Sequence, residues 1–442
     1  MKTKPVKKQT VKSAIIFVLL MAMLVNLTSC YSADTSDVSA GNSSNTVSRE
    51  PTARMCNLSA DISPNTVSGK KASDSFVNST ANFSIELFKK SITDKENSLV
   101  SPLSVLLALS MTANGADNET LSQMEKILGN NISIDDLNEY LFKYVKNLPS
   151  DDKSKLSIAN SIWFCDNENR LTVEKNFLQK NADYYNAAAY MCPFDDQTLK
   201  DINDWVKTNT DGLIDKILEE IDPDTVMYLI NAIVFDAEWQ NVYSTEDISE
   251  GTFTAIDGSK QTAEFMHSNE SEYLNDGNAT GFIKPYFNDN YSFVALLPNE
   301  DISIEDYIQT LSGKGFLKTI KTAESASVNA TLPKFSYAYT IKMNDALIDL
   351  GMPDAFSGDI ADFSKLGKSA GGNIYIGEVL HKTFISVDEL GTKAGAVTKV
   401  EMQCKGMIQD IKVVTLDRPF VYAIIDNSTN LPVFIGTVMS IN

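Results

Sequence analysis

The sequence predicts an α+β fold with antiparallel sheets, in one body that spans residues 74–442. Helical spacing dominates the first half, beginning with Phe76, Phe83 and Leu87, whereas alternating strand patterns dominate from residue 250 onward. Segregated helices and strands are typical of α+β proteins, whereas a doubly wound fold alternates them. The chain has no internal repeat and no second linker, so we expect a single domain.

The elements can be predicted in chain order from periodicity and turn chemistry. Ser101-Pro102 opens an apolar helix, because a proline in the first turn loses no hydrogen bond. Further helices are predicted over residues 118–128, 135–147, 173–183 and 198–218. Strands are predicted over residues 155–164, 226–236 and 374–387.

The composition excludes several classes of function. Acidic residues outnumber basic ones 58 to 38, and a net charge of −20 repels phosphate backbones, so we expect no nucleic-acid partner. Two histidines, His267 and His381, leave little room for a metal site, and we predict neither metal nor cofactor. The five cysteines form no CxxC pair, which argues against a disulfide framework.

The N-terminal residues 1–29 have the pattern of a lipoprotein signal peptide. Lysines precede an apolar run over residues 14–25 that is too short for an ordinary membrane span. The run ends in Leu27-Thr28-Ser29-Cys30, which resembles the lipobox of bacterial lipoproteins. Cys30 would then be the lipid attachment site. The alternative is a secretory signal with a chance cysteine.

Residues 30–73 are predicted to form a tether. Ser, Thr and Asn supply 18 of the 43 positions from 31 to 73, and neither Phe nor Trp occurs. Such a composition buries too little apolar surface to order itself. We therefore expect a cell-surface lipoprotein whose folded body is held outside the membrane by an N-terminal lipid.

A search for catalytic motifs predicts no enzyme. Gly367-Lys368-Ser369-Ala370-Gly371 matches the GxSxG pattern, but a nucleophile elbow needs a strand before the serine and a helix after it. Here the segment 372–376 reads as a strand. The lone His381 lies in an apolar strand, where a hydrogen-bonded core residue is the simpler interpretation.

The segment from Glu389 to Lys405 has the most informative pattern. From Thr392, uncharged and mostly small residues alternate with Lys393, Lys399 and other polar residues. This period of two predicts a strand with one buried face. Gly391, Ala394, Gly395 and Ala396 are nevertheless weak strand formers. The segment is therefore interpreted as a strand that enters an existing sheet, with an ordinary edge strand as the alternative.

These residues resemble the reactive-loop hinge of the serpin family. The hinge positions that match are Glu389, Gly391, Thr392, Ala394, Gly395 and Ala396. Other segments are similar to serpin signatures too, among them NSLVSPLSVLLALSMTANGA from residue 97, LINAIVFDAEW from residue 229, and Lys284-Pro285-Tyr286. The resemblance covers about residues 74–442.

The resemblance implies a serpin fold, with helices packed on three mainly antiparallel β-sheets and an exposed reactive loop. It places Ser101, Pro102, Ser104, Asn231 and His381 at the shutter and Trp239 at the breach. The implied function is that of a suicide-substrate inhibitor of serine proteases. A protease forms an acyl-enzyme with the loop, and the cleaved loop then inserts into the central sheet as an extra strand, a known case of strand addition and released strain.

The residues of the loop agree with insertion. No proline and no charge occurs at an inward position from Thr392 to Cys404, and either would be costly inside a sheet. The family's spacing from Glu389 places the scissile bond at Lys405-Gly406, which favours a trypsin-like protease. The loop is about three residues longer than usual, so Met402, Cys404 and Met407 remain alternatives that suit an elastase-like pocket.

Inhibition is not the only function that fits. The alternative is a non-inhibitory, serpin-fold binding module on the cell surface, whose loop never inserts. In both cases we expect an extracellular monomer.

Overall fold

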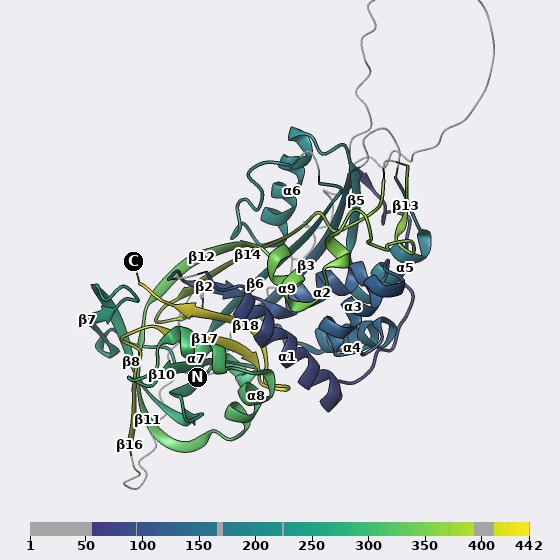
Figure 1. Ribbon diagram of the computed structural model, residues 1–442. Coiled ribbons are helices and arrows are strands. Elements are labelled where there is room, and N and C mark those ends of the chain that lie inside the picture. Colours follow the sequence, from purple (N-terminus) through teal and green to yellow (C-terminus); the bar gives the residue numbers. More distant parts are fainter. Residues whose placement is uncertain are drawn as a thin grey trace, which may run out of the picture. The chain divides into compact units, whose positions relative to one another are not determined.

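A computed structural model describes residues 55–93, 95–165, 171–222, 225–370, 372–392 and 411–441. The predicted signal peptide, Cys30 and the reactive loop from residue 393 to 410 lie outside these residues. The described part, shown in Figure 1, belongs to one compact unit.

The helices follow the predicted order. Their bounds are α1 (Asp74–Lys90), α2 (Pro102–Ala113), α3 (Asn118–Gly129), α4 (Ile134–Asn147), α5 (Lys175–Tyr185), α6 (Asp196–Asn209), α7 (Ile304–Thr310), α8 (Gly313–Lys321) and α9 (Asn344–Leu350). Short 3-10 helices are η1 (Thr245–Asp247), η2 (Phe287–Asp289) and η3 (Asp354–Phe356). The helix predicted to reach residue 218 ends at 209, because Asp211 and Gly212 have positive φ and the Thr210 hydroxyl bonds to the Val206 carbonyl instead of continuing the helix.

A seven-stranded sheet forms one layer of the fold. Its strands are β1 (Cys56–Asn57), β3 (Ser154–Cys165), β5 (Ala188–Cys192), β6 (Met227–Glu238), β12 (Phe335–Lys342), β14 (Glu378–Val387) and β15 (Gly391–Thr392). Their order across the sheet is β1-β5-β3-β6-β15-β14-β12, with a further direct pairing of β6 and β14.

A nine-stranded sheet forms the second layer. Its strands are β2 (Ser98–Val100), β7 (Ile248–Thr254), β8 (Lys260–Asn275), β9 (Ala279–Pro285), β10 (Tyr291–Pro298), β11 (Glu324–Pro333), β16 (Ile411–Thr415), β17 (Phe420–Asp426) and β18 (Leu431–Val438). The order is β16-β11-β8-β9-β10-β17-β18-β2, with β7 paired to β8.

A third, two-stranded sheet pairs β4 (Leu171–Val173) with β13 (Gly367–Ser369). Most pairings in the described residues are antiparallel, and the predicted α+β class is confirmed. Ser369 lies in β13, and the next strand after it is β14, so no helix follows the serine as a hydrolase elbow requires.

The predicted strand over residues 374–387 begins later than expected, at Glu378. The Asn344 side chain explains the late start, because its Nδ2 donates to the Gly377 carbonyl and its Oδ1 accepts from the Val379 amide. The residues before Glu378 turn toward η3, where the Ile376 amide donates to the Ala355 carbonyl.

The core lies on both faces of the seven-stranded sheet. Helix α2 is buried along its whole length and contacts both β6 and β18, so it fills the space between the two large sheets. Odd-numbered residues of β6, such as Leu229 and Ile233, point into this main core. Even-numbered residues, such as Tyr228 and Ile230, join a second cluster with α6 on the opposite face.

The folded body starts earlier than the sequence suggested. Cys56–Asn57 pairs with β5 as the edge strand of the seven-stranded sheet, and the Asn65 amide donates to Asp183 of α5 at 2.7 Å. The Lys70 amide donates to the Glu139 carbonyl of α4. The last part of the expected tether is therefore ordered by contacts with distant residues, which its own composition does not reveal.

Candidate functional site

The hinge is a tight turn that leads from β14 into β15. One carboxylate oxygen of Asp388 accepts from the Leu390 and Gly391 amides at 2.9 and 3.2 Å, and the Asp388 amide donates to the Gly391 carbonyl. A Cβ on Gly391 would lie 2.0 Å from the Ala237 carbonyl oxygen. Glycine is thus required there by the close approach of β15 to β6.

Thr392 is already part of the sheet. It pairs with Val387 of β14 and Ala237 of β6, is 2 % exposed, and shares a hydrogen bond with the Tyr286 hydroxyl. Its inward orientation agrees with the predicted parity of the segment. The resemblance implied an exposed reactive loop, and this expectation is wrong at Thr392, because the Asp388 turn carries the chain directly between β6 and β14.

Glu389 is fixed at the edge of the hinge. Its carboxylate pairs with Lys334 at 2.8 Å, and this contact lowers the pKa of Glu389 below its ordinary value. The Glu389 carbonyl accepts from the Tyr243 amide. Side chain and backbone together tie the start of the hinge to neighbouring elements.

Trp239, the predicted breach residue, caps the top of the sheet beside the hinge. Its indole Nε1 donates to the Asp388 carbonyl at 2.8 Å, and its amide donates to the Leu390 carbonyl. The ring stacks on Tyr286 with centroids 4.5 Å apart. Trp239 therefore holds both sides of the turn from which the loop departs.

A buried ion pair lies under this cap, and the sequence analysis did not find it. Lys284 and Glu270 are 2 % and 7 % exposed and lie 2.9 Å apart. The Lys284 ammonium also lies over the rings of Tyr243 and Trp239. Burial works against the charge of Lys284, yet Tyr243 and the Glu270 carboxylate together hold its pKa above the ordinary value. A lysine inside the apolar run GFIKPYF was the one available signal.

Below the hinge, the seven-stranded sheet is split. Strands β6 and β14 pair in parallel only from Tyr228–Glu378 to Asn231–His381. Above that point, residues 232–236 and 382–386 have no strand partner on their facing edges among the described residues, until β15 enters at Ala237 and Val387. In the described part of the chain, the facing edges of β6 and β14 are therefore unpaired over this stretch, directly below Thr392.

His381 lies where the split closes. It is 1 % exposed, and its Nε2 accepts the Ser101 amide at 3.0 Å, just ahead of Pro102 at the start of α2. Burial lowers the pKa of His381 from 6.5 to about 3, so the ring is neutral and its proton is on Nδ1. Nδ1 has no hydrogen-bond partner among the described side chains.

The structure brings together most of the predicted shutter and breach. Ser101, Ser104 and Pro102 are buried at the start of α2, beneath the strands that carry His381 and Asn231. Asn231 is placed by its backbone in β6, in register with His381. The remaining hinge and reactive-bond predictions lie outside the described residues: Ala394, Gly395, Ala396, Met402, Cys404, Lys405, Gly406 and Met407.

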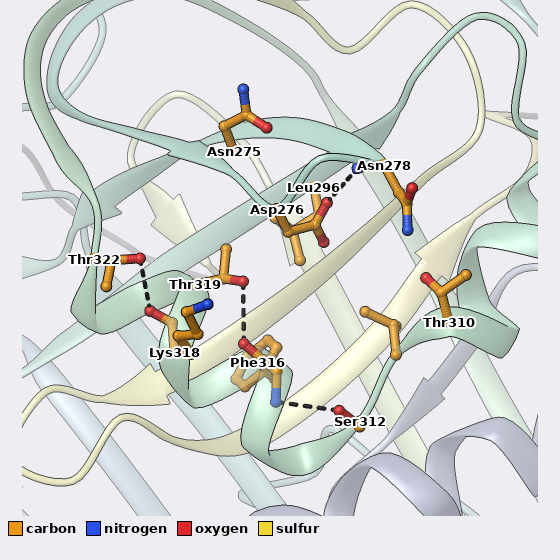
Figure 2. A pocket seen from close by; sticks show the side chains of 12 residues that line it. Asn275, Asp276, Asn278, Leu296, Thr310, Ser312, Phe316, Lys318, Thr319 and Thr322 are labelled. Atoms are coloured by element: carbon orange, nitrogen blue, oxygen red, sulfur yellow. Dashed lines mark hydrogen bonds between the residues drawn. The ribbon is translucent and has the colours of Figure 1, made fainter.

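A cavity of about 310 Å³ lies away from the hinge, between α8 and the turn from β8 to β9 (Figure 2). Asp276 accepts from the Asn278 amide and from the Tyr307 hydroxyl, and the Ser312 hydroxyl accepts from the Gly315 amide. These polar groups of the cavity wall are thus hydrogen-bonded to neighbouring residues of the protein.

The described residues contain no helix long and apolar enough to cross a membrane, and no cluster of three metal-binding side chains.

Comparisons with known proteins agree with this geometry. A family model described as "Serpin (serine protease inhibitor)" matches residues 78–441. A serpin-like protein of Thermococcus kodakarensis is 29% identical over 373 residues, covering 82% of this chain and 85% of the relative. The structure of a thermophilic serpin, tengpin, in its native state is 60% identical, with a TM-score of 0.84, and covers 88% of this chain and 100% of tengpin. Its latent state gives a lower TM-score of 0.76, with 85% and 100% covered.

The buried His381 predicts a pH dependence of stability. Between pH 6.5 and about 3 the unfolded chain binds a proton at this position and the folded chain does not. The free energy of unfolding therefore falls as the pH falls, by at most about 1.4 kcal/mol per pH unit. His381→Gln keeps an acceptor for the Ser101 amide but cannot titrate, so the variant lacks this loss.

The measurement is the free energy of unfolding of wild type and His381→Gln from pH 8 to pH 4. The difference between them should be constant above pH 7 and change in favour of the variant below 6.5. Parallel curves over the whole range would contradict a buried neutral histidine.

The Lys284–Glu270 pair predicts a non-additive double-mutant cycle. Lys284→Met leaves a buried carboxylate without its partner, which costs about 3–5 kcal/mol of stability. Adding Glu270→Met removes the second charge and should restore most of that loss. Lys334→Met is the matched control, because the Lys334–Glu389 pair is partly exposed and worth less than about 1 kcal/mol. Equal unfolding midpoints for the Lys284 single and double variants would contradict a buried pair whose two charges depend on each other.

Proposed function

The chain belongs to the serpin family, and from that premise we propose that it inhibits a serine protease as a suicide substrate. Serpins generally are protease inhibitors, but some members of the family do not inhibit, so the inhibitory mechanism has to be argued from this chain. The observation that carries it is the split between β6 and β14, with the first two residues of the loop already paired at its upper end.

Continuing the register of β15 gives each inserting residue a definite neighbour. Thr392 faces Ala237 and Val387, so Ala394 would face Phe235 and Ile385 in the same antiparallel register. Phe235 and Ile385 are 7 % and 2 % exposed and belong to the main core. A small residue at position 394 suits this place, because a larger or charged one would have to displace packed side chains.

The next inward positions are equally compatible. Ala396 would lie between Ile233 and the buried Thr383, and Thr398 would lie between Asn231 and His381. The hydroxyl of Thr398 could then accept from Nδ1–H of His381. The inward residues of the loop are thus small where they would face Phe235, Ile385 and Ile233, and polar where Thr398 would face His381.

Outward positions have a different environment. Lys393 would face Asp236, an opposite-charge cross-strand pair of the kind that stabilises a sheet modestly. Insertion would also replace the four direct rungs between β6 and β14, at the point where His381 binds the Ser101 amide.

The proposed reaction begins when the protease serine attacks the carbonyl carbon of Lys405. The bond to the Gly406 nitrogen breaks, Gly406 leaves as a free amine, and Lys405 becomes the acyl group of the enzyme. Residues 392–405 can extend about 45 Å as a strand, so insertion would carry the acylated protease along the sheet before water attacks the ester. A lysine at this position suits a trypsin-like protease, whereas Met402, Cys404 or Met407 would suit an elastase-like one.

We also propose that inhibition takes place outside the cell. Cys30 would carry the lipid that anchors the protein, and the chain up to residue 54 would connect this anchor to the folded body. Diacylation together with an amide-linked chain provides the two signals that stable anchoring requires.

The inhibitory mechanism predicts opposite behaviour at adjacent loop positions. Ala394→Glu would have to bury a charge between Phe235 and Ile385, so insertion should slow and the protein should become a substrate. Lys393→Glu changes an outward position and should keep most of the inhibition. The measurement is the number of inhibitor molecules consumed per molecule of trypsin or elastase inactivated, together with a complex that survives denaturing electrophoresis.

Equal stoichiometries for the two variants would argue against insertion. Clean cleavage of the wild type without any stable complex would instead favour the non-inhibitory binding module. Thr392→Arg is unsuitable for this test, because Thr392 is buried before cleavage and the variant would perturb the native sheet.

The anchor predicts that a radioactive fatty acid labels the protein through Cys30. Cells that express the wild type should yield a labelled protein in the membrane fraction, and Cys30→Ala should yield an unlabelled one. Cys56→Ala is the control, since its thiol lies in β1 and not at the lipobox. Label retained by Cys30→Ala would contradict the anchor.

A further inference from the structure

One end of the nine-stranded sheet has an outer surface that combines exposed aliphatic side chains with neutral polar ones. Strands β16, β11 and β8 lie side by side, and β7 pairs with β8 at the same end of the fold (Figure 1). Residues in register point to the same side of a sheet. The outward residues of these strands are His267, Asn269, Glu272, Ser325, Ser327, Asn329, Thr331, Ile411, Val413 and Thr415. Ser249 of β7 joins them through its hydrogen bond to His267, and we call this set the β16 face. The alternate residues Val328, Ala330 and Val414 point into the core.

The β16 face combines two exposed aliphatic side chains with a polar platform. Ile411 and Val413 are 60 % and 66 % exposed, on an edge strand that has β11 on one side only among the described residues. Exposed large hydrophobic side chains that adjoin one another on a sheet edge are a feature of contact surfaces.

The polar side chains of the face hold one another across the strands. Asn269 donates to Ser327 at 2.8 Å and to Asn329 at 3.3 Å. His267 links Ser249, at 2.8 Å, to Thr331, at 3.2 Å. Side chains that are ordered before binding lose less entropy when a partner arrives.

The face carries one charged residue, Glu272, at the end next to Ser325, although the chain has 58 acidic and 38 basic residues. The centres of protein interfaces are depleted in charged residues in the same way. A partner surface that fits the part of the face around Ile411 and Val413 is therefore uncharged, with an apolar contact for these two side chains.

The position of the face in the chain identifies the partner. Ile411 is the fifth residue after Gly406, and five residues span at most about 18 Å. A protease domain of 150–250 residues has a radius of gyration of about 15–18 Å. A protease that holds the bond between Lys405 and Gly406 in its active site therefore has its body within reach of this end of the sheet.

We propose that the β16 face is the docking surface for the target protease, and that it contacts an uncharged region beside the protease's active-site cleft. This inference rests on the proposed inhibitory function and adds a second contact to the loop itself. The contact acts on the encounter, before acylation, so it sets the rate of association and leaves insertion unchanged.

The test is the second-order rate of inhibition of trypsin or elastase, whichever forms the stable complex, by Val413→Glu and by Val413→Lys. Each variant places a charge that must lose its water against an uncharged partner, so both should slow association at least tenfold. The number of inhibitor molecules consumed per protease should stay at the wild-type value. Ile360→Glu and Ile360→Lys are matched controls, because Ile360 is 61 % exposed and lies outside the β16 face, in the segment between η3 and β13. Strand β13 and strand β16 are at opposite ends of the view in Figure 1.

Each alternative gives a different result. If both Val413 variants inhibit within twofold of the wild-type rate while complexes form normally, the docking proposal is wrong and the inhibitory function stands. If Val413→Glu and Val413→Lys shift the rate in opposite directions, net charge explains the effect and the proposal is again overturned. A wild-type dimer that Val413→Glu converts to a monomer, measured by light scattering, would assign the face to a second copy. If the wild type forms no complex with any protease, the proposed function fails, and the docking proposal with it.

Discussion

The incomplete pairing of β6 and β14 is the constraint on which the rest of the structure depends. The two strands form direct rungs only over Tyr228–Asn231 and Glu378–His381, and above these they diverge until β15 enters between them. Backbone groups along a gap in a sheet are left without their best partners, so the closed sheet is less stable than one with a continuous strand in that place. In the described residues, β15 ends at Thr392 at the upper end of this gap. In the proposed mechanism, the loop that follows Thr392 would fill the unpaired position.

Different polar contacts hold the entrance and the closed end of the split, where Glu378 also pairs with Lys342 and Thr383 donates to the Leu99 carbonyl. At the entrance, Trp239 and the carboxylate of Asp388 hold the hinge turn, and the buried Lys284–Glu270 pair lies under the indole. At the closed end, four backbone rungs and the neutral His381, which accepts one amide, hold the strands together. A buried ion pair has strict geometric requirements, whereas backbone rungs can be exchanged for equivalent ones with an incoming strand. In the proposed mechanism, insertion would therefore exchange the four rungs and leave the contacts of the hinge turn in place.

The sequence predicted the features that local periodicity encodes, and it missed the contacts between residues far apart in the chain. The alternation predicted an inward Thr392, because a period of two is a local property of a strand, and Thr392 is buried. The later positions of the alternation lie outside the described residues. The pattern could not reveal that Thr392 is already buried, since this follows from the width of the gap between β6 and β14. The strand at Cys56–Asn57 is two residues long and exists only through its pairing with β5, so no pattern within it predicts it. Lys284 was noted only as part of a serpin signature, and its partner Glu270 belongs to the preceding strand of the sheet, so the sequence does not show that their side chains meet.

The two ends of the loop belong to different sheets, which in the proposed mechanism would separate protease binding from protease trapping. Thr392 lies in the seven-stranded sheet, whereas Ile411 begins β16 at the edge of the nine-stranded sheet. Cleavage at Lys405-Gly406 would leave the acylated protease on the half that continues from Thr392, and the β16 face on the half that remains behind. Contacts at the face would therefore speed the encounter but have to break once insertion begins. A face with two aliphatic side chains and a neutral polar platform is consistent with both demands, because its contacts add to association without adding a buried ion pair that would be costly to separate.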